Sequence, residues 1–406
     1  MIVPNSSVVF PSSNLDHNLR DSFPLLSGFS STRELEASPI YAELRAEIDR
    51  VLGGTVHESL REGSGSTHPY LRATAWNLER GLRLAGIIRV LQEHPELSQS
   101  DLIFATELDY GMTRTQNRFV ARELAAALKM DYAFAPCYMN LNKGAGLEAN
   151  SPGENTQALH GNALFSRFPM REAHSLALPN GKDKMKGREK RLGCQRAVLA
   201  LVDHPLGTLR AISVHLDAHC TQGHRQHQMK LILEHLEGWN PSLPTLIGGD
   251  WNTSTYNSKN AAYSILGYAR RVLMGVRHVL ENHYPYPDRW FERHLFREIE
   301  RRGYSYRDLN ESGVCTLHYD VEDLSTNENM GEWIPDWCFW FIEWALKKQQ
   351  GRCSMKLDWF AGKDVIPYPD HPPRVVNGLV DSEGALSDHD PIVLDFLVDG
   401  QRGEGY

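Results

Sequence analysis

The amino-acid sequence predicts a mixed α/β fold with two or more layers, and two observations lead to that prediction. From about residue 70, short apolar runs alternate with stretches in which apolar residues repeat at helical spacing. This alternation is typical of helices packed against sheets. The 406 residues are 41% hydrophobic and 23% charged, which is the composition of a globular protein with a substantial core.

Each expected element is a run with a recognisable period. The strands are expected at 71–76, 102–106, 162–166, 197–202, 209–214, 244–248, 356–360 and 391–396. The helices are expected at 82–94, 116–129 and 223–238. These elements predict one main domain over residues 70–398.

Residues 1–69 are expected to lie outside that domain. Residues 1–31 are rich in Ser, Pro and Asn and have no periodicity, which predicts a poorly ordered lead-in. The run 38–52 has helical spacing and stops at Gly53-Gly54, which predicts an accessory helix. A linker rich in Gly, Ser and His then reaches the main domain near Tyr70.

Residues 255–350 interrupt the alternation with a mostly helical insertion that could cap a site. Its span 267–310 carries nine Arg and no Lys against six acids. Four tryptophans follow at helical spacing, Trp333, Trp337, Trp340 and Trp344. Packing in a core is the favoured interpretation, and a stacking platform for bases or a contact with a membrane interface are the alternatives.

Charge and cysteine content restrict the class of protein. A formal net charge of −8 argues against a general nucleic-acid coat protein, although a metal-dependent nuclease stays compatible with it. The six cysteines are scattered without a CxxC pair, which favours reduced thiols. No signal peptide and no transmembrane segment is evident, so we expect a soluble cytoplasmic protein. No protein partner is evident either.

Several apolar runs end in a polar or ionisable residue. Asn77, Glu107, His215 and Asp250 each follow such a run. Side chains at the ends of core strands can converge on one rim of a sheet, where α/β enzymes place their chemistry. We therefore expect these four side chains to meet.

Each motif by itself leaves an alternative open. Asp250 and Asn252 in GGDWNT emerge together after two glycines, and the same pair could form an Asx-turn. His389 in SDHDP could act as an acid or as a donor to phosphate if a second carboxylate fixes its tautomer, and Asp358 could be that carboxylate. Hydrolysis of a phosphate ester needs a cation, a base and a donor, and hard oxygen ligands suit Mg²⁺ or Mn²⁺.

The order of the motifs is more specific than any one of them. The chain resembles the endonuclease/exonuclease/phosphatase superfamily through N-x-E, T-E-L-D, HGN, S-V-H-L, GGDWNT, LDWF and SDHDP, in that order. The superfamily includes deoxyribonuclease I, exonuclease III, apurinic endonucleases, neutral sphingomyelinases and inositol polyphosphate 5-phosphatases. The resemblance covers residues 70–256 and 354–397, and implies a four-layer α/β sandwich with two packed mixed sheets.

The resemblance also implies a metal site for Mg²⁺ or Mn²⁺. Glu107 would be the principal ligand, with Asn77 and Asp388 around the same ion. Glu79 stands where some members have a metal-binding Asp.

The remaining roles concern the reaction. Asp250 would orient or deprotonate water, and Asn252 would hold the phosphate or that water. His389, oriented by Asp358, would stabilise the pentacovalent phosphate. The resemblance further places His215 against the phosphate and Asn162 in the lining of the site.

Two further clusters have alternative interpretations. The histidines from His215 to His227 suggest zinc, but the fixed spacing of a helical zinc motif is absent and a solvated helix face is favoured. The loop 181–196 has seven basic residues against two acids. It is expected to be a solvated loop, with a contact to a phosphate backbone as the alternative.

The leading hypothesis is thus a divalent-metal-dependent phosphodiesterase of nuclease type acting on a phosphoester, with nucleic acid as a candidate substrate. One alternative is a phosphatase or a sphingomyelinase-like hydrolase of a small or lipid phosphoester. Another, from a different class, is a non-catalytic binding module on the same fold.

Overall fold

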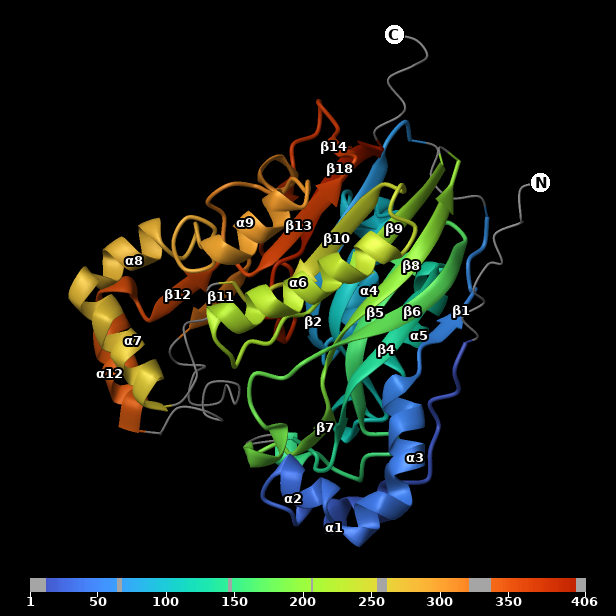
Figure 1. Cartoon of the computed structure of the whole chain (residues 1–406). Coiled ribbons are helices and arrows are strands. Elements are labelled where there is room, and N and C mark those ends of the chain that lie inside the picture. The colour runs from blue at the N-terminus through green and yellow to red at the C-terminus, as the bar shows by residue number, and fades with distance from the viewer. Residues whose placement is uncertain are drawn as a thin grey trace.

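A computed structural model describes residues 12–63, 68–144, 148–205, 207–253, 261–320 and 337–398. Two mixed β-sheets lie face to face at its centre (Figure 1). The larger sheet has the order β1 (Val56–Glu58), β4 (Asp131–Asn140), β5 (Leu159–Ser166), β3 (Leu102–Tyr110), β2 (Leu71–Arg80), β18 (Ile392–Val398) and β14 (Val365–Pro367). Two short strands extend it, β15 (Arg374–Val375) on β18 and β7 (Arg191–Gly193) on β4.

The second sheet has five strands. Their order is β13 (Asp358–Lys363), β10 (Thr245–Asp250), β9 (Gly207–Ser213), β8 (Gln195–His204) and β6 (Met170–Leu178). An apolar core between the sheets takes residues from both, such as Phe104 and Leu164 from one and Val198 and Phe360 from the other. Because such side chains alternate with outward-facing ones, each sheet also offers an apolar outer face.

Helices cover the two outer faces and complete a four-layer sandwich, as expected. Those on the larger sheet are α3 (Pro39–Gly53), α4 (Leu84–Glu93) and α5 (Val120–Leu128). Those on the second sheet are α6 (Gln222–Gly238) and α9 (Arg293–Arg301). Trp359 of β13 and Trp251, just after β10, pack against Phe296 of α9.

The segment before residue 70 differs from expectation. The helix at 38–52 is confirmed as α3, but the described part of the expected lead-in is ordered and carries α1 (Phe23–Ser27), with α2 (Thr32–Glu36) just after it. Its Leu15, Leu19, Phe23 and Leu26 belong to the same buried cluster as the core of the larger sheet. The prediction of a poorly ordered segment was wrong because four apolar side chains are enough to anchor it in the core, whatever its overall composition. Residues 1–11 lie outside the described residues, and the boundary at 69/70 stays a prediction.

The described parts of the insertion at 255–350 do not form one unit, as had been expected, but two. In its described parts it is mostly helical, but α9 is a layer of the sandwich. The remainder forms an arm made of α7 (Ala261–Met274), α8 (Val276–Asn282), α12 (Trp337–Leu346) and the pair β11 (Leu317–Asp320) and β12 (Arg352–Met355). A small separate apolar cluster around Leu346 holds α8, α12 and the strand pair together.

The expected strands and helices are present with shifted ends. The strands that were missed among the described residues are β1, β4, β6, β7, β11, β12 and β14, and the two-residue strands β15, β16 (Val380–Asp381) and β17 (Gly384–Ala385). β4 contains Pro136 and is buried along its whole length, so it shows neither alternation nor a continuous run of strand-forming residues. No helix of the described residues is long and apolar enough to cross a bilayer.

Candidate active site

Four strands from the two sheets bring the expected residues to one edge of the sandwich. Asn77 lies near the end of β2 and Glu107 near the end of the neighbouring parallel strand β3. Asp250 ends β10 and pairs in register with Asp358, the first residue of the antiparallel β13. The convergence expected from the ends of the apolar runs is therefore present.

Irregular backbone turns these side chains into the site. The β2–β3 pairing shifts register between Asn77 and Arg80, and the β3–β5 pairing shifts between Ala105 and Leu108. Within these bulges Glu79 and Glu107 have φ values of +45° and +57°, in the left-handed region that a glutamate rarely occupies. Such strain persists only where the surrounding structure enforces it, and it clusters at functional sites.

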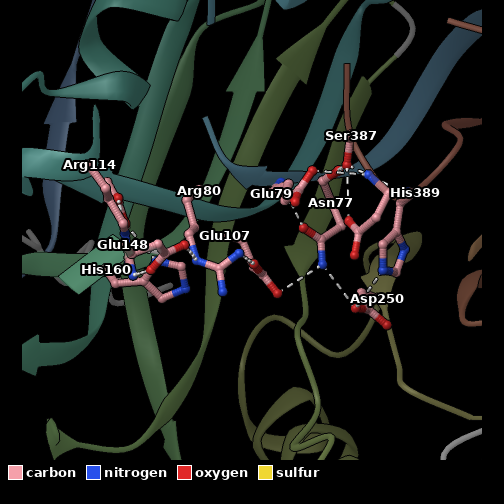
Figure 2. Close-up of polar contacts among 12 residues, drawn as sticks. Asn77, Glu79, Arg80, Glu107, Arg114, Glu148, His160, Asp250, Ser387 and His389 are labelled. Carbon is pink, nitrogen blue, oxygen red and sulfur yellow. Dashed lines mark hydrogen bonds and ion pairs between the residues drawn. The ribbon is translucent and has the colours of Figure 1, made fainter. Parts of the chain in front are cut away.

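Asn77 is the link between the two sheets. Its Nδ2 donates to Glu107 Oε1 at 3.1 Å and to Asp250 Oδ2 at 3.1 Å, as Figure 2 shows. Its Oδ1 accepts the backbone N–H of Glu79 at 3.0 Å, and Glu79 Oε2 accepts the backbone N–H of Asp388 at 3.2 Å. Four of the expected ligand residues are thus contiguous.

His389 faces the same point from the opposite side. Its Nδ1 is bonded to Asp358 Oδ2 at 2.7 Å, and its Nε2 lies 3.8 Å from Asp250 Oδ2. Ser387 fastens this loop to β2, because its Oγ donates to the Asn77 carbonyl at 2.7 Å and accepts the His389 N–H at 3.1 Å. The imidazole therefore has the oriented geometry expected from the sequence.

The three other expected residues are placed differently from one another. His215 joins the centre, with Nε2 at 3.5 Å from Asp250 Oδ2 and 4.0 Å from Glu107 Oε1. The Asn252 N–H donates to Asp250 Oδ1 at 2.8 Å. The two residues therefore form the Asx-turn considered above and also lie at the site. Asn162 Oδ1 accepts the N–H of Glu107 at 3.4 Å, and its amide donates to the Arg196 carbonyl, so its shown role is to hold backbone.

Buried carboxylates dominate the electrostatics. Burial raises the pKa of Asp250 to about 8, an effect partly opposed by His389. Burial and the nearby Asp388 raise the pKa of Glu79 to about 7. The pKa of Asp388 is likewise raised by burial, with Glu107 adding to it. Because burial is the largest cause of each rise, these values reflect the cost of holding carboxylate charge away from water.

Two groups depart from that trend. Burial would raise the pKa of Glu107, but Arg80 and His215 hold it well below its usual value. Burial would lower the pKa of His389, but Asp358, Asp388 and Asp250 raise it well above its usual value. These neighbours therefore favour the ionised form of Glu107 and the protonated form of His389.

A network of charged residues beside Glu107 was missed in the sequence. Arg80 Nη1 lies 4.0 Å from Glu107 Oε2, and its Nε pairs with Glu148 Oε1 at 3.1 Å. Arg114 in turn binds Glu148 at 2.7 Å and both oxygens of Asp109 (Figure 2). The sequence signal for this network was the position of Arg80, three residues after Asn77, but its partners Glu107 and Glu148 lie far from it along the chain.

A second missed group comes from β11. Thr316, just before it, donates to Asp358 Oδ2 at 2.6 Å and so supports the carboxylate behind His389. Leu317 forms a bridge with His389, and the N–H of His318 donates to the Asp388 carbonyl at 3.2 Å. No pattern in residues 255–350 indicated this contact.

The donor set fits a hydrated divalent cation. Among the described residues no three His, Cys, Asp or Glu side chains already surround one point. Mg²⁺ does not need such a cage, because it keeps several waters and takes one or two carboxylates. Glu107 supplies hard carboxylate oxygens, and Asn77 Oδ1, which accepts the Glu79 N–H, keeps a second lone pair. Burial disfavours the charged forms of Glu79 and Asp388, and a cation would favour them.

The same search gives no support for zinc among the described histidines. His224 Nε2 contacts the Pro179 carbonyl at 2.8 Å instead. The basic loop is also largely occupied by internal contacts. Lys184 pairs with Asp217 at 3.1 Å, Lys190 Nζ donates to the Ser27 and Phe29 carbonyls, and Arg191 pairs with Glu189. These contacts favour a structural role for the loop 181–196.

Comparison with known proteins shows a similarity of fold and no match in sequence. No family model matches the sequence, and no curated protein matches it. The chain is similar to solved structures of the endonuclease/exonuclease/phosphatase superfamily. One is such a protein from Beutenbergia cavernae, with 13% identity over 82% of this chain and 72% of that one, at a TM-score of 0.47.

Two others have assigned names. The D. rerio TDP2 in complex with a single-strand DNA product has 14% identity over 82% of this chain and all of that one, at a TM-score of 0.44. The human Nocturnin catalytic domain with bound sulfate has 15% identity over 85% of this chain and 97% of that one, at a TM-score of 0.41. Likeness at this identity says nothing about what this chain acts on.

Proposed function

We propose that the protein is a divalent-metal-dependent hydrolase of phosphoesters. One observation carries this proposal: the imidazole of His389, held by Asp358 at 2.7 Å, faces Asp250 beside the pair Asn77 and Glu107. These residues come from distant parts of the chain, and a structural role alone does not require buried carboxylates and an imidazolium to gather at one edge. Buried charge of this kind is costly and is retained where chemistry uses it.

The residues divide the reaction between them. Asp250 accepts the proton of the attacking water, whose oxygen forms the new bond to phosphorus while the bond to the leaving oxygen breaks. The His389 imidazolium donates to a phosphoryl oxygen and stabilises the charge of the pentacovalent phosphate, and its charge also favours the carboxylate form of Asp250. Asp358 fixes the ring so that Nε2 faces the phosphate.

The cation would be held by Glu107 and Asn77, with Asp388 and Glu79 nearby, and would neutralise charge on the phosphoryl oxygens. His215 would contact the phosphate, and its distances to Glu107 and Asp250 support this role. Asn252 would bind the phosphate or the water from the turn after β10. Asn162 would act by holding the backbone of Glu107.

The substrate class has two candidates. The nuclease-type hypothesis stays a prediction, but the internal contacts of Lys184, Lys190 and Arg191 reduce the support that the basic loop gave it. A lipid or small phosphoester, the other candidate, does not need that loop. The test therefore uses plasmid DNA, RNA, a phospholipid, sphingomyelin and a chromogenic phosphodiester.

The deciding experiment measures hydrolysis with Mg²⁺ or Mn²⁺, with a chelator, and with two variants. We expect the chelator to abolish turnover, and Asp250→Asn and His389→Ala each to lower kcat by about 100-fold or more. Asp131→Asn is the matched control, because Asp131 is also a buried carboxylate but begins β4, at the opposite end of the sheet from Glu107.

Full turnover by Asp250→Asn would overturn the assigned base. No turnover of any phosphoester with either metal would favour a non-catalytic binding module.

A further inference from the structure

The arm carries exposed apolar side chains. Leu273 and Leu266 of α7 are 87% and 67% exposed, and Trp344 of α12 is 61% exposed. Tyr263, Ile265, Met274 and Trp340 are also exposed large hydrophobic residues of the arm. Concentration of such side chains in one substructure is unusual, because exposed apolar residues are normally scattered.

The exposed side chains follow the period of their helices. Tyr263, Leu266 and Leu273 are spaced by three and seven residues, so they share one face of α7. The opposite face is the polar one, where Arg271 contacts Tyr284 of the neighbouring loop and Gly267 is buried. This is the reverse of a helix that covers a core, whose apolar face turns inward.

Basic residues accompany these apolar faces. The arm segments 261–282, 317–320 and 337–355 contain six Lys or Arg residues and three acids, in a chain whose net charge is −8. Lys347 and Lys348 follow α12 directly and are exposed, and Arg270 lies on α7 beside Leu266 and Leu273. A local positive surface with tryptophan and leucine is the composition of segments that lie in the interface of an anionic bilayer.

The arm adjoins the candidate active site. Tyr319 of β11 packs in the small apolar cluster with Leu346 of α12. Two residues earlier, Leu317 forms a bridge with His389, and the His318 N–H donates to the Asp388 carbonyl. One four-residue strand thus contacts both the apolar cluster of the arm and the loop that carries His389.

We propose that the arm formed by α7, α8, α12 and β11–β12 docks on a bilayer containing anionic lipids, and that the site takes its phosphoester from a lipid head group. The lipid substrate rests on the proposed function, whereas the docking surface does not. A surface of exposed leucines has no partner on nucleic acid, where aromatic stacking and phosphate pairing dominate. A symmetric dimer through the arm would place its basic residues against their own copies.

The test is co-sedimentation of the whole protein with vesicles of phosphatidylcholine, with and without phosphatidylserine. We expect binding to the vesicles that contain phosphatidylserine, and about tenfold or more loss of affinity in Leu266→Ser/Leu273→Ser. Leu25→Ser is the matched control, because Leu25 is 64% exposed on α1, away from the arm (Figure 1). A second variant, Lys347→Glu/Lys348→Glu, is expected to lose binding to the anionic vesicles and to leave the apolar face intact.

The outcomes separate the two proposals. Turnover of a soluble chromogenic phosphodiester is expected to be unchanged in Leu266→Ser/Leu273→Ser, whereas turnover of vesicle-borne lipid phosphoester falls. Absence of vesicle binding by the unaltered protein, with soluble turnover intact, overturns the docking surface and leaves the hydrolase. Vesicle binding without any turnover overturns the hydrolase and leaves the surface. Light scattering that finds a dimer dissociated by Leu266→Ser/Leu273→Ser, without vesicle binding, also overturns the docking surface.

Discussion

His389 lies between two carboxylates that act on it differently. Asp358 is within hydrogen-bond distance of Nδ1, whereas Asp250 is 3.8 Å from Nε2 and leaves that nitrogen directed toward the reaction centre. Asp358 is itself held by the Thr316 hydroxyl at 2.6 Å. The position of the ring therefore depends on a residue pair that does not touch the phosphate.

The role of Asp358 can be tested by removing its charge. We expect Asp358→Asn to lower kcat by about 10- to 100-fold with little change in KM, because the imidazolium loses its partner while the binding groups remain. Thr316→Val removes one hydrogen bond to the same carboxylate without changing its charge, and a smaller loss is expected. Steady-state kinetics on the chromogenic phosphodiester measure both, and unchanged kcat in Asp358→Asn would contradict the assignment.

Asp101 is a buried carboxylate outside the candidate site, and its titration affects the stability of the fold. Asp101 precedes β3, and its Oδ2 accepts the Arg72 N–H at 2.9 Å. Its Oδ1 is buried without a hydrogen-bond partner among the described residues. Burial raises the pKa of Asp101 from 3.8 to about 6. The folded state therefore holds this proton more tightly than the unfolded chain does.

This shift predicts how stability changes with pH. Between about pH 4 and pH 6 the folded state binds more protons, so stability falls as pH rises through that window. Asp101→Asn cannot titrate, so we expect it to stabilise the protein above pH 7 by up to about 3 kcal/mol and to have little effect near pH 4. Urea unfolding at the two pH values measures the difference, and equal effects at both would count against the shift.

At the scale of elements, irregular strand ends decide where the chemistry lies. Gly249 of β10 has a φ of +132°, and an added Cβ would lie 2.2 Å from the Val214 carbonyl oxygen. This close approach carries the chain into the turn that presents Asp250 and Asn252. The glycine Gly249 of the motif GGDWNT is therefore needed for its backbone conformation, whereas Asp250 and Asn252 are needed for their side chains.

Substitution of Gly249 tests this requirement. We expect Gly249→Ala to cost about 2 kcal/mol or more of stability and to reduce turnover, because alanine is strained at this positive φ and its Cβ would clash with the Val214 carbonyl oxygen. In Gly238→Ala, at the end of α6, the added methyl group has nothing within 4 Å, and a change within about 1 kcal/mol is expected. Thermal unfolding and kinetics of the two variants decide the matter, and a stable, active Gly249→Ala would refute it.

Which elements could be predicted follows from how they are buried. Strands such as β2 and β3 are continuous apolar runs that end in polar residues, so both the strand and its functional end were visible in the sequence. β4 and β6 were not, because β4 contains a proline and β6 is half exposed with mixed polarity. The bulges at Glu79 and Glu107 have no signature, since they arise from pairing with neighbouring strands.

At the scale of the whole molecule, the N-terminal segment is part of the main core. Leu26 is 0% exposed and belongs to the cluster that includes Trp76 and Phe134, whereas its neighbour Leu25 is 64% exposed. The two leucines are adjacent on α1 and differ only in the direction of the side chain. They therefore form a matched pair for testing whether residues 12–63 unfold with the sandwich.

We expect Leu26→Ala to lower the free energy of unfolding by about 2–5 kcal/mol and Leu25→Ala to change it by less than about 0.5 kcal/mol. Both values come from urea unfolding followed by tryptophan fluorescence, which reports on buried Trp76 and Trp251 of the sandwich. If the segment were separable from the sandwich, neither variant would shift that transition.

The sequence by itself determined the α/β class, most of the central strands and the set of polar residues at their ends, because apolar periodicity and motif order are local properties of the chain. Only the tertiary structure decided which of these residues meet. It placed Asn77 between Glu107 and Asp250, turned Asn162 toward the backbone and brought Arg80, Thr316 and β11 to the site. It also turned the apolar face of α7 outward. The physical reason is that pairing, burial and charge compensation between distant segments depend on partners that no local pattern specifies.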